Sequence, residues 1–233
     1  MFTMFSIFKE HRHNAKQIFM LALFTLFIYW FAFSFGIRAS GDIAGLPRFI
    51  FMLVGFIPWF FISDSILFGS QSIRKNRQFV VKMYFPVSNI MTFTLLEKFM
   101  VHLLLCGLMV IYLCFAGYWP SVYTLQFFYY CPLMFLFFLA LSWSTAPMSA
   151  FSRDFENFIK SIMTGLFWLS SVMWDSYTPI NYFVNGYRKA FVSQEWFWEY
   201  PQETLIFLAE LVVVMLLGMY NYKRLRKRLP DVL

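Results

Sequence analysis

Charged residues are scarce in this sequence, and their scarcity excludes a soluble globular protein. They make up 13% of the chain, against about 25% in an average soluble domain. Hydrophobic residues reach 60% and aromatic residues 23%. A chain of 233 residues can bury a sizeable core, but it cannot bury this much apolar surface and still cover itself with polar groups. The composition therefore predicts an integral membrane protein.

Motifs that carry catalysis or metal binding are also missing. The chain has no Gly-rich phosphate loop ending in Lys, no HExxH or comparable His/Glu cluster, and no G-x-S-x-G motif. Its three cysteines, Cys106, Cys114 and Cys131, lack metal-ligand spacing and are expected to be small apolar core residues. We therefore expect this chain to be no enzyme and to hold neither a metal nor a cofactor.

Long apolar runs are what the chain has instead. Runs of about 17 to 22 residues match a bilayer core of about 30 Å when they are helical, and they lack the alternation of a barrel strand. The sequence predicts an all-α membrane protein with six transmembrane helices, at residues 17–37, 49–68, 95–115, 125–146, 158–174 and 205–222. We expect residues 1–16 to form an amphipathic cytoplasmic segment, 17–222 the six-span transmembrane domain, and 223–233 a basic cytoplasmic tail.

The net charge of +7 invites a nucleic-acid interpretation, but the basic residues follow a membrane pattern. With a cytoplasmic N-terminus, the inner segments hold Lys9, Arg12, Lys16, Arg74, Lys75, Arg77, Lys82, Arg153, Lys223, Arg224, Arg226, Lys227 and Arg228. The outer segments hold only Arg38, Arg48, Arg188 and Lys189. This asymmetry predicts that both termini are cytoplasmic, which agrees with an even number of spans. We expect no nucleic-acid partner.

Two connecting segments are neither plain spans nor plain loops. Residues 74–85 mix basic side chains with Phe79 and other apolar residues, which predicts a short amphipathic helix at the cytoplasmic face. Such a helix either anchors to anionic lipid or docks a cytoplasmic partner. The stretch INYFVNGYRKAFV between spans five and six is too short to cross the membrane and too apolar for a solvated loop. It predicts a re-entrant or interfacial segment.

Charged residues near or within spans are costly in lipid and therefore informative. Asp64, Glu97 and Lys98 either reach the inner membrane interface, alone or as ion pairs, or face a cavity or a subunit interface. His102 follows one turn after Lys98. Glu210 lies well inside the sixth span, where we expect an interhelical partner rather than a proton relay.

Several stretches, in their order along the chain, resemble the permease subunits of type-2 ABC exporters of lipid-linked polysaccharides, specifically the teichoic acid translocation permease. They are YWFAFSFGIRAS, FMLVGFIPWFFISDSILFGSQSIRKN, VVKMYFPVSNI, FSRDFENFIKSIMTGLFWLSSVMW and TPINYFVNGYRKAF. Each alone is weak, but the ordered set is fairly specific for the family. The chain departs from the family by a shorter segment before the first span and by fewer residues between SSVMW and TPINYF.

The resemblance implies a homodimer that works with two copies of a separate ABC ATPase, which binds ATP and magnesium. The substrate would be a polyprenyl-pyrophosphate-linked glycopolymer, in the cytoplasmic membrane of a bacterium. The residues that would couple the permease to the ATPase are Arg74, Lys75, Arg77, Phe79, Lys82, Arg153 and Asp154. Lys98, His102, Tyr187 and Arg188 match positions of the substrate path and outer gate.

Aromatic residues offer apolar faces to sugar rings along such a path, or else pack in the core or face lipid. The candidates are Tyr29, Trp30, Phe33, Trp59 and Trp168. Capsule or O-antigen export, small-lipid or drug export, and a non-transporting membrane scaffold remain alternatives. Arg188 on the outer side is either a headgroup-level anchor or a clamp for an anionic group such as a lipid pyrophosphate.

Overall fold

The computed structural model describes residues 20, 23–24, 27–28, 31, 43, 45–82, 86–170, 172 and 181–229. Over these residues the protein is helical, with one isolated antiparallel bridge between Ile43 and Leu46. The helices, in chain order, are α2 (Arg48–Lys75), α3 (Arg77–Lys82), α4 (Val87–Phe115), η2 (Val122–Gln126), α5 (Phe127–Phe151), α6 (Arg153–Leu169), α7 (Tyr182–Arg188), η4 (Lys189–Ser193), η5 (Phe197–Glu199), α8 (Pro201–Leu225) and η6 (Arg226–Arg228).

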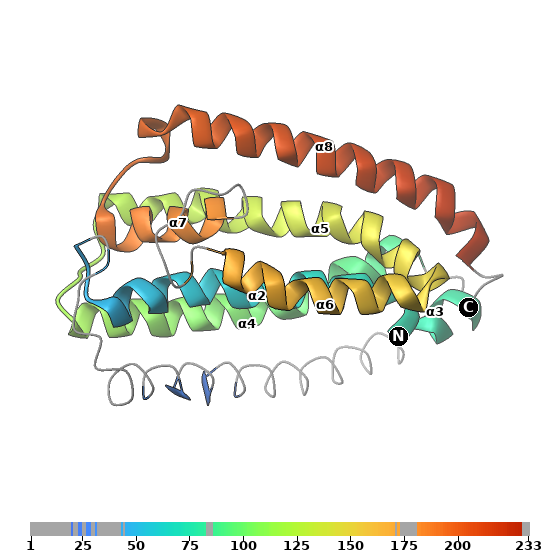
Figure 1. The fold of residues 1–233 in the computed structure, drawn as a ribbon, viewed down its shortest axis with the longest axis horizontal. Coiled ribbons are helices and arrows are strands. Elements are labelled where there is room, and N and C mark those ends of the chain that lie inside the picture. Colours follow the sequence, from blue (N-terminus) through green and yellow to red (C-terminus); the bar gives the residue numbers. More distant parts are fainter. Residues whose placement is uncertain are drawn as a thin grey trace.

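Helix α2 is the centre of the bundle, with α4, α5, α6 and α7 packed around it (Figure 1). It is apolar on all sides, as a helix must be when it is surrounded by other helices. Its buried residues run without a break from Ile50 to Trp59. The interior of the single chain is therefore occupied by a helix and its side chains.

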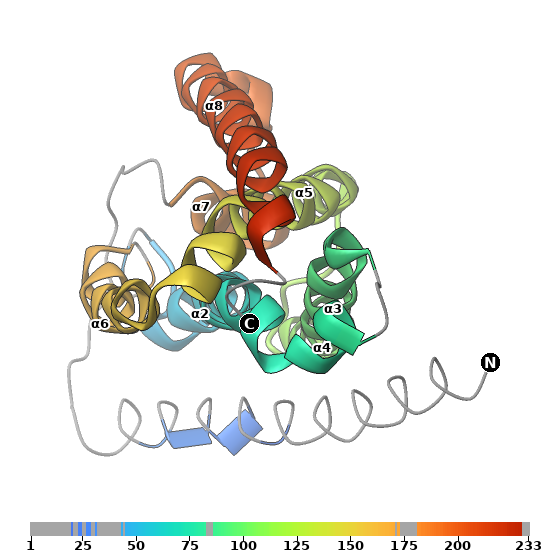
Figure 2. The same ribbon diagram turned by 90° about the vertical axis from the view of Figure 1, so that its right-hand side faces the viewer.

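Helix α8 packs against α5 and stands apart from the rest of the bundle (Figure 2). The two helices approach closely at Gly218, where an added Cβ would overlap the Ala140 carbonyl. Gly69 plays the same part between α2 and α5, because a Cβ there would overlap the Ser142 hydroxyl. Small residues at such crossings allow the close packing that holds helices together in lipid.

Four helical stretches of the described chain are long enough and apolar enough to cross a membrane: α2, α4, Val122–Phe151 and α8. They contain the second, third, fourth and sixth predicted spans. The first predicted span, at 17–37, lies mostly outside the described residues. The coarser prediction of an all-helical membrane protein is confirmed over the part that the structure describes, whereas six spans and their orientation stay predictions.

Two helices extend well beyond the spans that the sequence predicts. Helix α2 has 28 residues, or about 42 Å at a rise of 1.5 Å per residue. Arg74 and Lys75 therefore lie on the last turn of this long helix, and only the six residues of α3 form the short helix expected after it. Helix α4 begins at Val87, so Glu97 and Lys98 lie well inside it rather than at its start.

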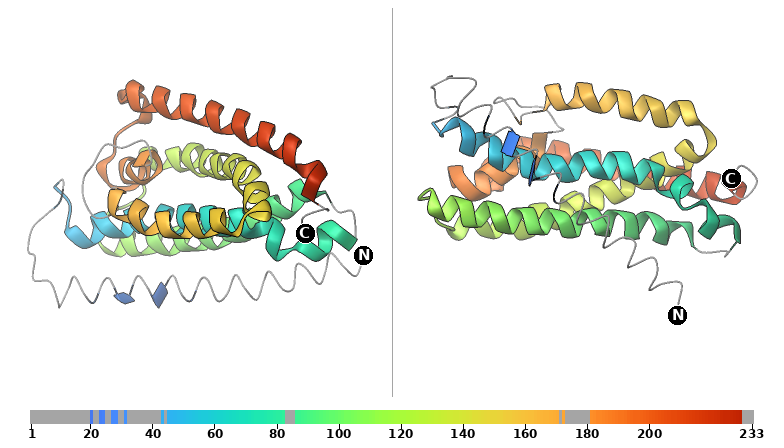
Figure 3. Two further views of the ribbon diagram at one scale, coloured as in Figure 1. Left: turned by 45° about the vertical axis from the view of Figure 1, so that its right-hand side comes forward. Right: turned by 90° about the horizontal axis from the view of Figure 1, so that it is seen from below.

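The fifth predicted span is placed differently by the structure. Helix α6 has 17 residues and begins at Arg153, where the Ser152 hydroxyl accepts a hydrogen bond from the Phe155 amide. It runs beside α2 (Figure 3), burying Ile159 and Met163 while Phe158 and Trp168 stay exposed. Its charged start belongs to the same helix as its apolar part, which makes α6 amphipathic rather than uniformly apolar.

The two ends of the bundle differ in charge. The end at which α2 ends and α6 begins, at the right of Figure 1, carries the basic residues of α2, α3, α6 and α8; we refer to it as the basic end. The opposite end holds α7, η4 and the start of α8 (Figure 1). Polar contacts link the helices at both ends, and a smaller set lies within the bundle.

Candidate functional site

Arg74 joins three helices at the basic end. Its Nη1 donates a hydrogen bond to Glu156 Oε2 of α6 at 2.9 Å. Its Nη2 donates to the backbone carbonyls of Ser149 and Ala150 in the last turn of α5. The last carbonyls of a helix carry partial negative charge, so a guanidinium there is favoured. Arg74, Glu156, Ser149 and Ala150 are referred to below as the Arg74 junction.

Glu156 has a second cationic partner, Lys160, one turn further along α6. Lys160 Nζ donates to Glu156 Oε1 at 2.6 Å. This hydrogen bond lowers the pKa of Glu156 below its ordinary value, and the charges of Lys160 and Arg74 add to the lowering. The sequence interpretation missed Glu156, although its spacing of four residues from Lys160 is a recognised sign of a helical ion pair.

The other predicted coupling residues mostly lie at the surface of the basic end. Lys75, Arg77, Arg153 and Asp154 are exposed, and Lys75 Nζ lies 4.5 Å from the centre of the Phe68 ring. Phe79 packs against the small cluster around Ile73 and Val80, and Lys82 is the last residue of α3. The structure thus separates Arg74, which is engaged within the chain, from neighbours that are open to a partner.

Lys98 is buried between α4 and α2. Its Nζ lies 3.2 Å from Glu97 Oε1 and 3.9 Å from the centre of the Phe68 ring. The side chain of Lys98 is only 3% exposed and that of Glu97 8%, so their ion pair is enclosed within the chain. Whether this group faces a cavity or a subunit interface stays a prediction.

His102 and Tyr187 are brought together from α4 and α7. His102 Nε2 lies 2.7 Å from the Tyr187 hydroxyl, and Cys106 Sγ lies 3.4 Å from the same nitrogen. All three side chains are buried. The resemblance implied a role for each of the first two residues but gave no reason to pair them. Cys131 is also buried and Cys114 is half-buried, as small apolar core residues would be.

Arg188 ties the short helix α7 to α2. Its Nε and Nη2 each lie 3.2 Å from the Phe51 carbonyl, Nη2 donates to the Val172 carbonyl at 3.0 Å, and Nη1 donates to Asn185 Oδ1 at 3.1 Å. The guanidinium also lies over the Phe51 ring, 3.5 Å from its centre. Gly55 makes room for it, since an added Cβ there would lie 2.6 Å from Nη2. Arg188 is therefore a buried cross-link.

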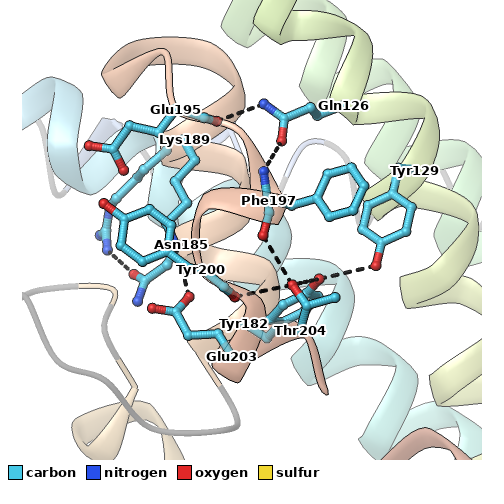
Figure 4. Close-up of polar contacts among 11 residues, drawn as sticks. Gln126, Tyr129, Tyr182, Asn185, Lys189, Glu195, Phe197, Tyr200, Glu203 and Thr204 are labelled. Carbon is cyan, nitrogen blue, oxygen red and sulfur yellow. Dashed lines mark hydrogen bonds and ion pairs between the residues drawn. The ribbon is translucent and has the colours of Figure 1, made fainter. Parts of the chain in front are cut away.

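Lys189 ties the next turn to α8. Its Nζ lies 2.8 Å from Glu203 Oε2 and 3.5 Å from the centre of the Tyr200 ring. Figure 4 shows Lys189, Tyr200 and Glu203 on one side of this segment. The two consecutive cations thus point to different helices, Arg188 to α2 and Lys189 to α8. Together they fix the segment that the sequence predicted to be re-entrant, although its place in a membrane stays a prediction.

A second set of polar contacts joins the same segment to α5 (Figure 4). The Tyr182 hydroxyl lies 3.1 Å from that of Tyr129 and 3.4 Å from Thr204 Oγ1. Gln126 Nε2 donates to the Glu195 carbonyl at 2.7 Å, and Gln126 Oε1 accepts from the Phe197 amide at 2.8 Å. The sequence interpretation missed Gln126. A single amide beside an otherwise apolar run was the available signal, because a buried amide needs partners.

The aromatic path candidates do not share one environment. Trp59 is buried in α2, with its ring centre 5.7 Å from that of Phe167. Trp168 is 55% exposed on α6. Tyr29, Trp30 and Phe33 lie outside the described residues. Within the single chain, Trp59 is thus a core residue, and Trp168 lies on the outer surface of the bundle.

Among the described residues, no group of three or more His, Cys, Asp or Glu side chains is placed to hold a metal ion. The polar groups instead connect helices: Arg74 at the basic end, Lys98 and His102 within the bundle, and Arg188 and Lys189 at the opposite end. Side-chain contacts thus connect the helices at both ends of the bundle, and further cations are exposed at the basic end.

Comparison with known proteins gives one informative similarity. The chain is 26% identical over 130 residues to the O-antigen export system permease protein RfbA of Myxococcus xanthus. The aligned region covers 55% of this chain and 50% of that protein, so the chain spans about half the length of the curated relative it matches. A scan against protein-family models finds no match.

Proposed function

We propose that this chain is the transmembrane subunit of an ATP-driven exporter that moves a lipid-linked polysaccharide across the cytoplasmic membrane of a bacterium. The similarity to an O-antigen export permease carries the proposal. Four membrane-length helices and the exposed cations of the basic end support it. A non-transporting membrane scaffold would need the same helices, but it would not need a docking surface for an ATPase.

The partners follow from this proposal. Two copies of an ABC ATPase, with ATP and magnesium, would supply the energy, and two copies of this chain would form the path. The structure favours a path between copies, because α2 fills the centre of the single chain with buried side chains. Lys98 and His102 would then act by holding α2, α4 and α7 in place rather than by touching the polymer.

The polymer itself has two candidates with different support. The similarity found by comparison favours an O-antigen or another surface polysaccharide, and the resemblance of the sequence stretches favours a teichoic acid precursor. Both are glycopolymers on a polyprenyl pyrophosphate carrier. Depleting the chain from its native cell should cause the lipid-linked polymer to accumulate inside, and sugar and phosphate composition of the accumulated material would distinguish the two. No accumulation of either polymer would contradict export.

The orientation is tested by labelling exposed positions at each end. In a Cys-free background, a cysteine replacing Ala116 should react with an impermeant thiol reagent from outside, and one replacing Gln78 should react only after the membrane is opened. Both positions are exposed in the structure. Ser72 is unsuitable because it is buried, so a cysteine there would stay unlabelled in either orientation. The reverse pattern would overturn the placement of the basic end in the cytoplasm.

ATPase docking is tested by reversing the exposed charges while leaving the Arg74 junction intact. The double variant Arg77→Glu, Arg153→Glu should lower recovery of the ATPase with the tagged chain by about tenfold or more, because like charges then face each other. Polymer export should fall with it. The matched control is Lys223→Glu, Arg224→Glu, which makes the same charge change at the end of α8. Equal recovery by both double variants would contradict docking at α3 and α6.

A further inference from the structure

Three aromatic rings lie in a row at the end of the bundle opposite the basic end. The ring centres of Tyr123 and Trp196 lie 4.9 Å apart with planes inclined by 41°, and Trp196 stacks on Trp198 with ring centres 4.3 Å apart and planes inclined by 12°. Trp198 ends the row and is 55% exposed. Tyr123, Trp196 and Trp198 are referred to below as the aromatic ladder. Its last ring presents a flat face that the chain leaves uncovered.

The backbone next to Trp196 is held by hydrogen bonds, which Figure 4 shows between Gln126 and the neighbouring residues Glu195 and Phe197. Gln126 bonds the backbone on both sides of Trp196, at the Glu195 carbonyl and the Phe197 amide. Phe197 stacks on Tyr129 with ring centres 4.3 Å apart, and the rings of Phe197 and Trp198 are inclined by 72° with centres 4.9 Å apart. A side chain that only dips into lipid headgroups needs no such bracing, whereas a binding surface gains affinity from being preorganised.

Carboxylates flank the ladder in the chain. Glu195 precedes Trp196, and Glu199 follows Trp198 and is exposed. Ionised carboxylates only accept hydrogen bonds, so they suit a ligand rich in hydroxyl donors. They are unfavourable next to anionic lipid headgroups. An exposed aromatic ring with acidic neighbours in the chain therefore suits a sugar ring, whose C–H groups pack on the electron-rich face of an indole.

We propose that the exposed face of Trp198 is a binding platform for a sugar ring of a glycan, with Glu199 and Glu195 accepting hydrogen bonds from its hydroxyl groups. The inference rests on the proposed export of a polysaccharide and deepens it by assigning a place where the polymer is held. At the end opposite the basic end, the platform would contact the polymer after it has crossed the membrane. Trp119 is also exposed at this end, at 70%, and serves as the matched control.

The test uses the full chain, together with its ATPase, in discs of zwitterionic lipid. The probe is delipidated surface polysaccharide isolated from the cells that produce the chain. Hydroxyl-radical oxidation, read by peptide mass spectrometry, reports the exposure of each tryptophan. The polysaccharide should protect Trp198 in a saturable manner and leave Trp119 unchanged. Absence of protection by any fraction of that polysaccharide would overturn the platform.

Variants distinguish a loss of the Trp198 ring from a loss of folded structure. Trp198→Ala should weaken retention of the polysaccharide by about fivefold, or about 1 kcal/mol, and Trp198→Phe should keep part of the affinity, because it keeps a flat apolar ring. Trp119→Ala should retain full binding. Gln126→Leu should also weaken binding, since it removes the bracing without touching the ligand. Thermal melting of each variant identifies any that lose binding only through unfolding.

Two outcomes would assign the ladder to the membrane instead. In the first, the oxidation of Trp198 is the same with and without polysaccharide and changes only when anionic lipid replaces the zwitterionic lipid. In the second, Trp119→Ala weakens polysaccharide binding as much as Trp198→Ala does. Either result overturns the platform. Failure of the proposed export function looks different, because the chain would then recover no ATPase and its depletion would cause no polymer to accumulate. Normal ATPase recovery with an unprotected Trp198 rejects the platform alone.

Discussion

The two ends of the bundle use cations in different ways. At the basic end, Arg74 pairs with Glu156 near the surface, and Lys160, which shares Glu156, is 48% exposed. At the opposite end, Arg188 and Lys189 are 5% and 8% exposed, and their partners are two backbone carbonyls, an amide, a carboxylate and two aromatic rings. The basic end has more cations, but the cations of the opposite end, Arg188 and Lys189, are buried within the chain.

The difference shows that burial, rather than charge, decides how firmly a cation holds its helix. Breaking a buried charge pair costs about 3–5 kcal/mol, because the remaining charge or polar group is left without water. An exposed pair contributes about 1 kcal/mol or less. The opposite end is therefore expected to be rigid and intolerant of substitution. The contacts of the Arg74 junction are expected to break more easily, for example when an ATPase docks at the neighbouring α3.

The largest expected effect is that of Arg188→Lys. Lysine keeps the charge, but its single ammonium group cannot reach the Phe51 and Val172 carbonyls and Asn185 at once. We expect a loss of about 3 kcal/mol of stability, seen as lower yield and a lower melting temperature in detergent. Arg153→Lys, at an exposed position of the basic end, should leave both unchanged. Normal stability with reduced export would instead favour a clamp for an anionic ligand.

An intermediate effect is expected at Gly186, on the same short helix. An added Cβ would overlap the Tyr130 ring, whereas a Cβ at Gly165 on α6 would meet nothing within 4 Å. Gly186→Ala should destabilise the protein by about 1–3 kcal/mol through overpacking. Gly165→Ala should be neutral or stabilise it by up to about 1 kcal/mol through helix propensity. The measurement is the melting temperature of the two variants. Equal values would show that the opposite end accepts an added methyl group as readily as α6 does.

The smallest expected effect concerns the pH dependence of the Arg74 junction. The pKa of Glu156 is lowered in the folded protein, so its contribution is present above the unfolded value of about 4.3 and is lost as pH falls through the folded value. As the pH falls below the unfolded value and then through the lower folded value, about 1 kcal/mol of stabilisation is lost, and the start of α6 should move away from α2. Distances between spin labels on the two helices would measure this movement.

Glu156→Gln should remove the pH dependence of that distance, and Asp154→Asn, at an exposed position two residues earlier, should leave it in place. An α6 that stays against α2 at low pH, or one that moves identically in the Glu156→Gln variant, would show that the junction does not hold the helix. If α6 stays against α2 at low pH, the basic end is as rigid as the opposite end, and the contrast between them disappears.

The helical class and the approximate positions of four membrane-length helices could be predicted because they depend on local sequence. An apolar run of sufficient length must be helical in lipid, wherever the rest of the chain lies. The helix ends were less predictable. Helix α2 continues past the apolar run to Arg74 and Lys75, and the Arg74 side chain finds its partners on α5 and α6. Those partners are distant in sequence.

By itself, the sequence determined that the chain is apolar, helical and basic at particular segments. It did not distinguish a central helix from a peripheral one. In α2, 72% of the most apolar window is buried within the chain, whereas in α8 the share is 11%. Both helices satisfy the same requirement for lipid, so their composition is alike. Only the tertiary structure decided which of them is surrounded, and it placed Arg188 against Gly55, His102 against Tyr187 and Gln126 behind the aromatic ladder. These pairings depend on how helices pack, and packing is set by shape and close contact between residues far apart in the chain.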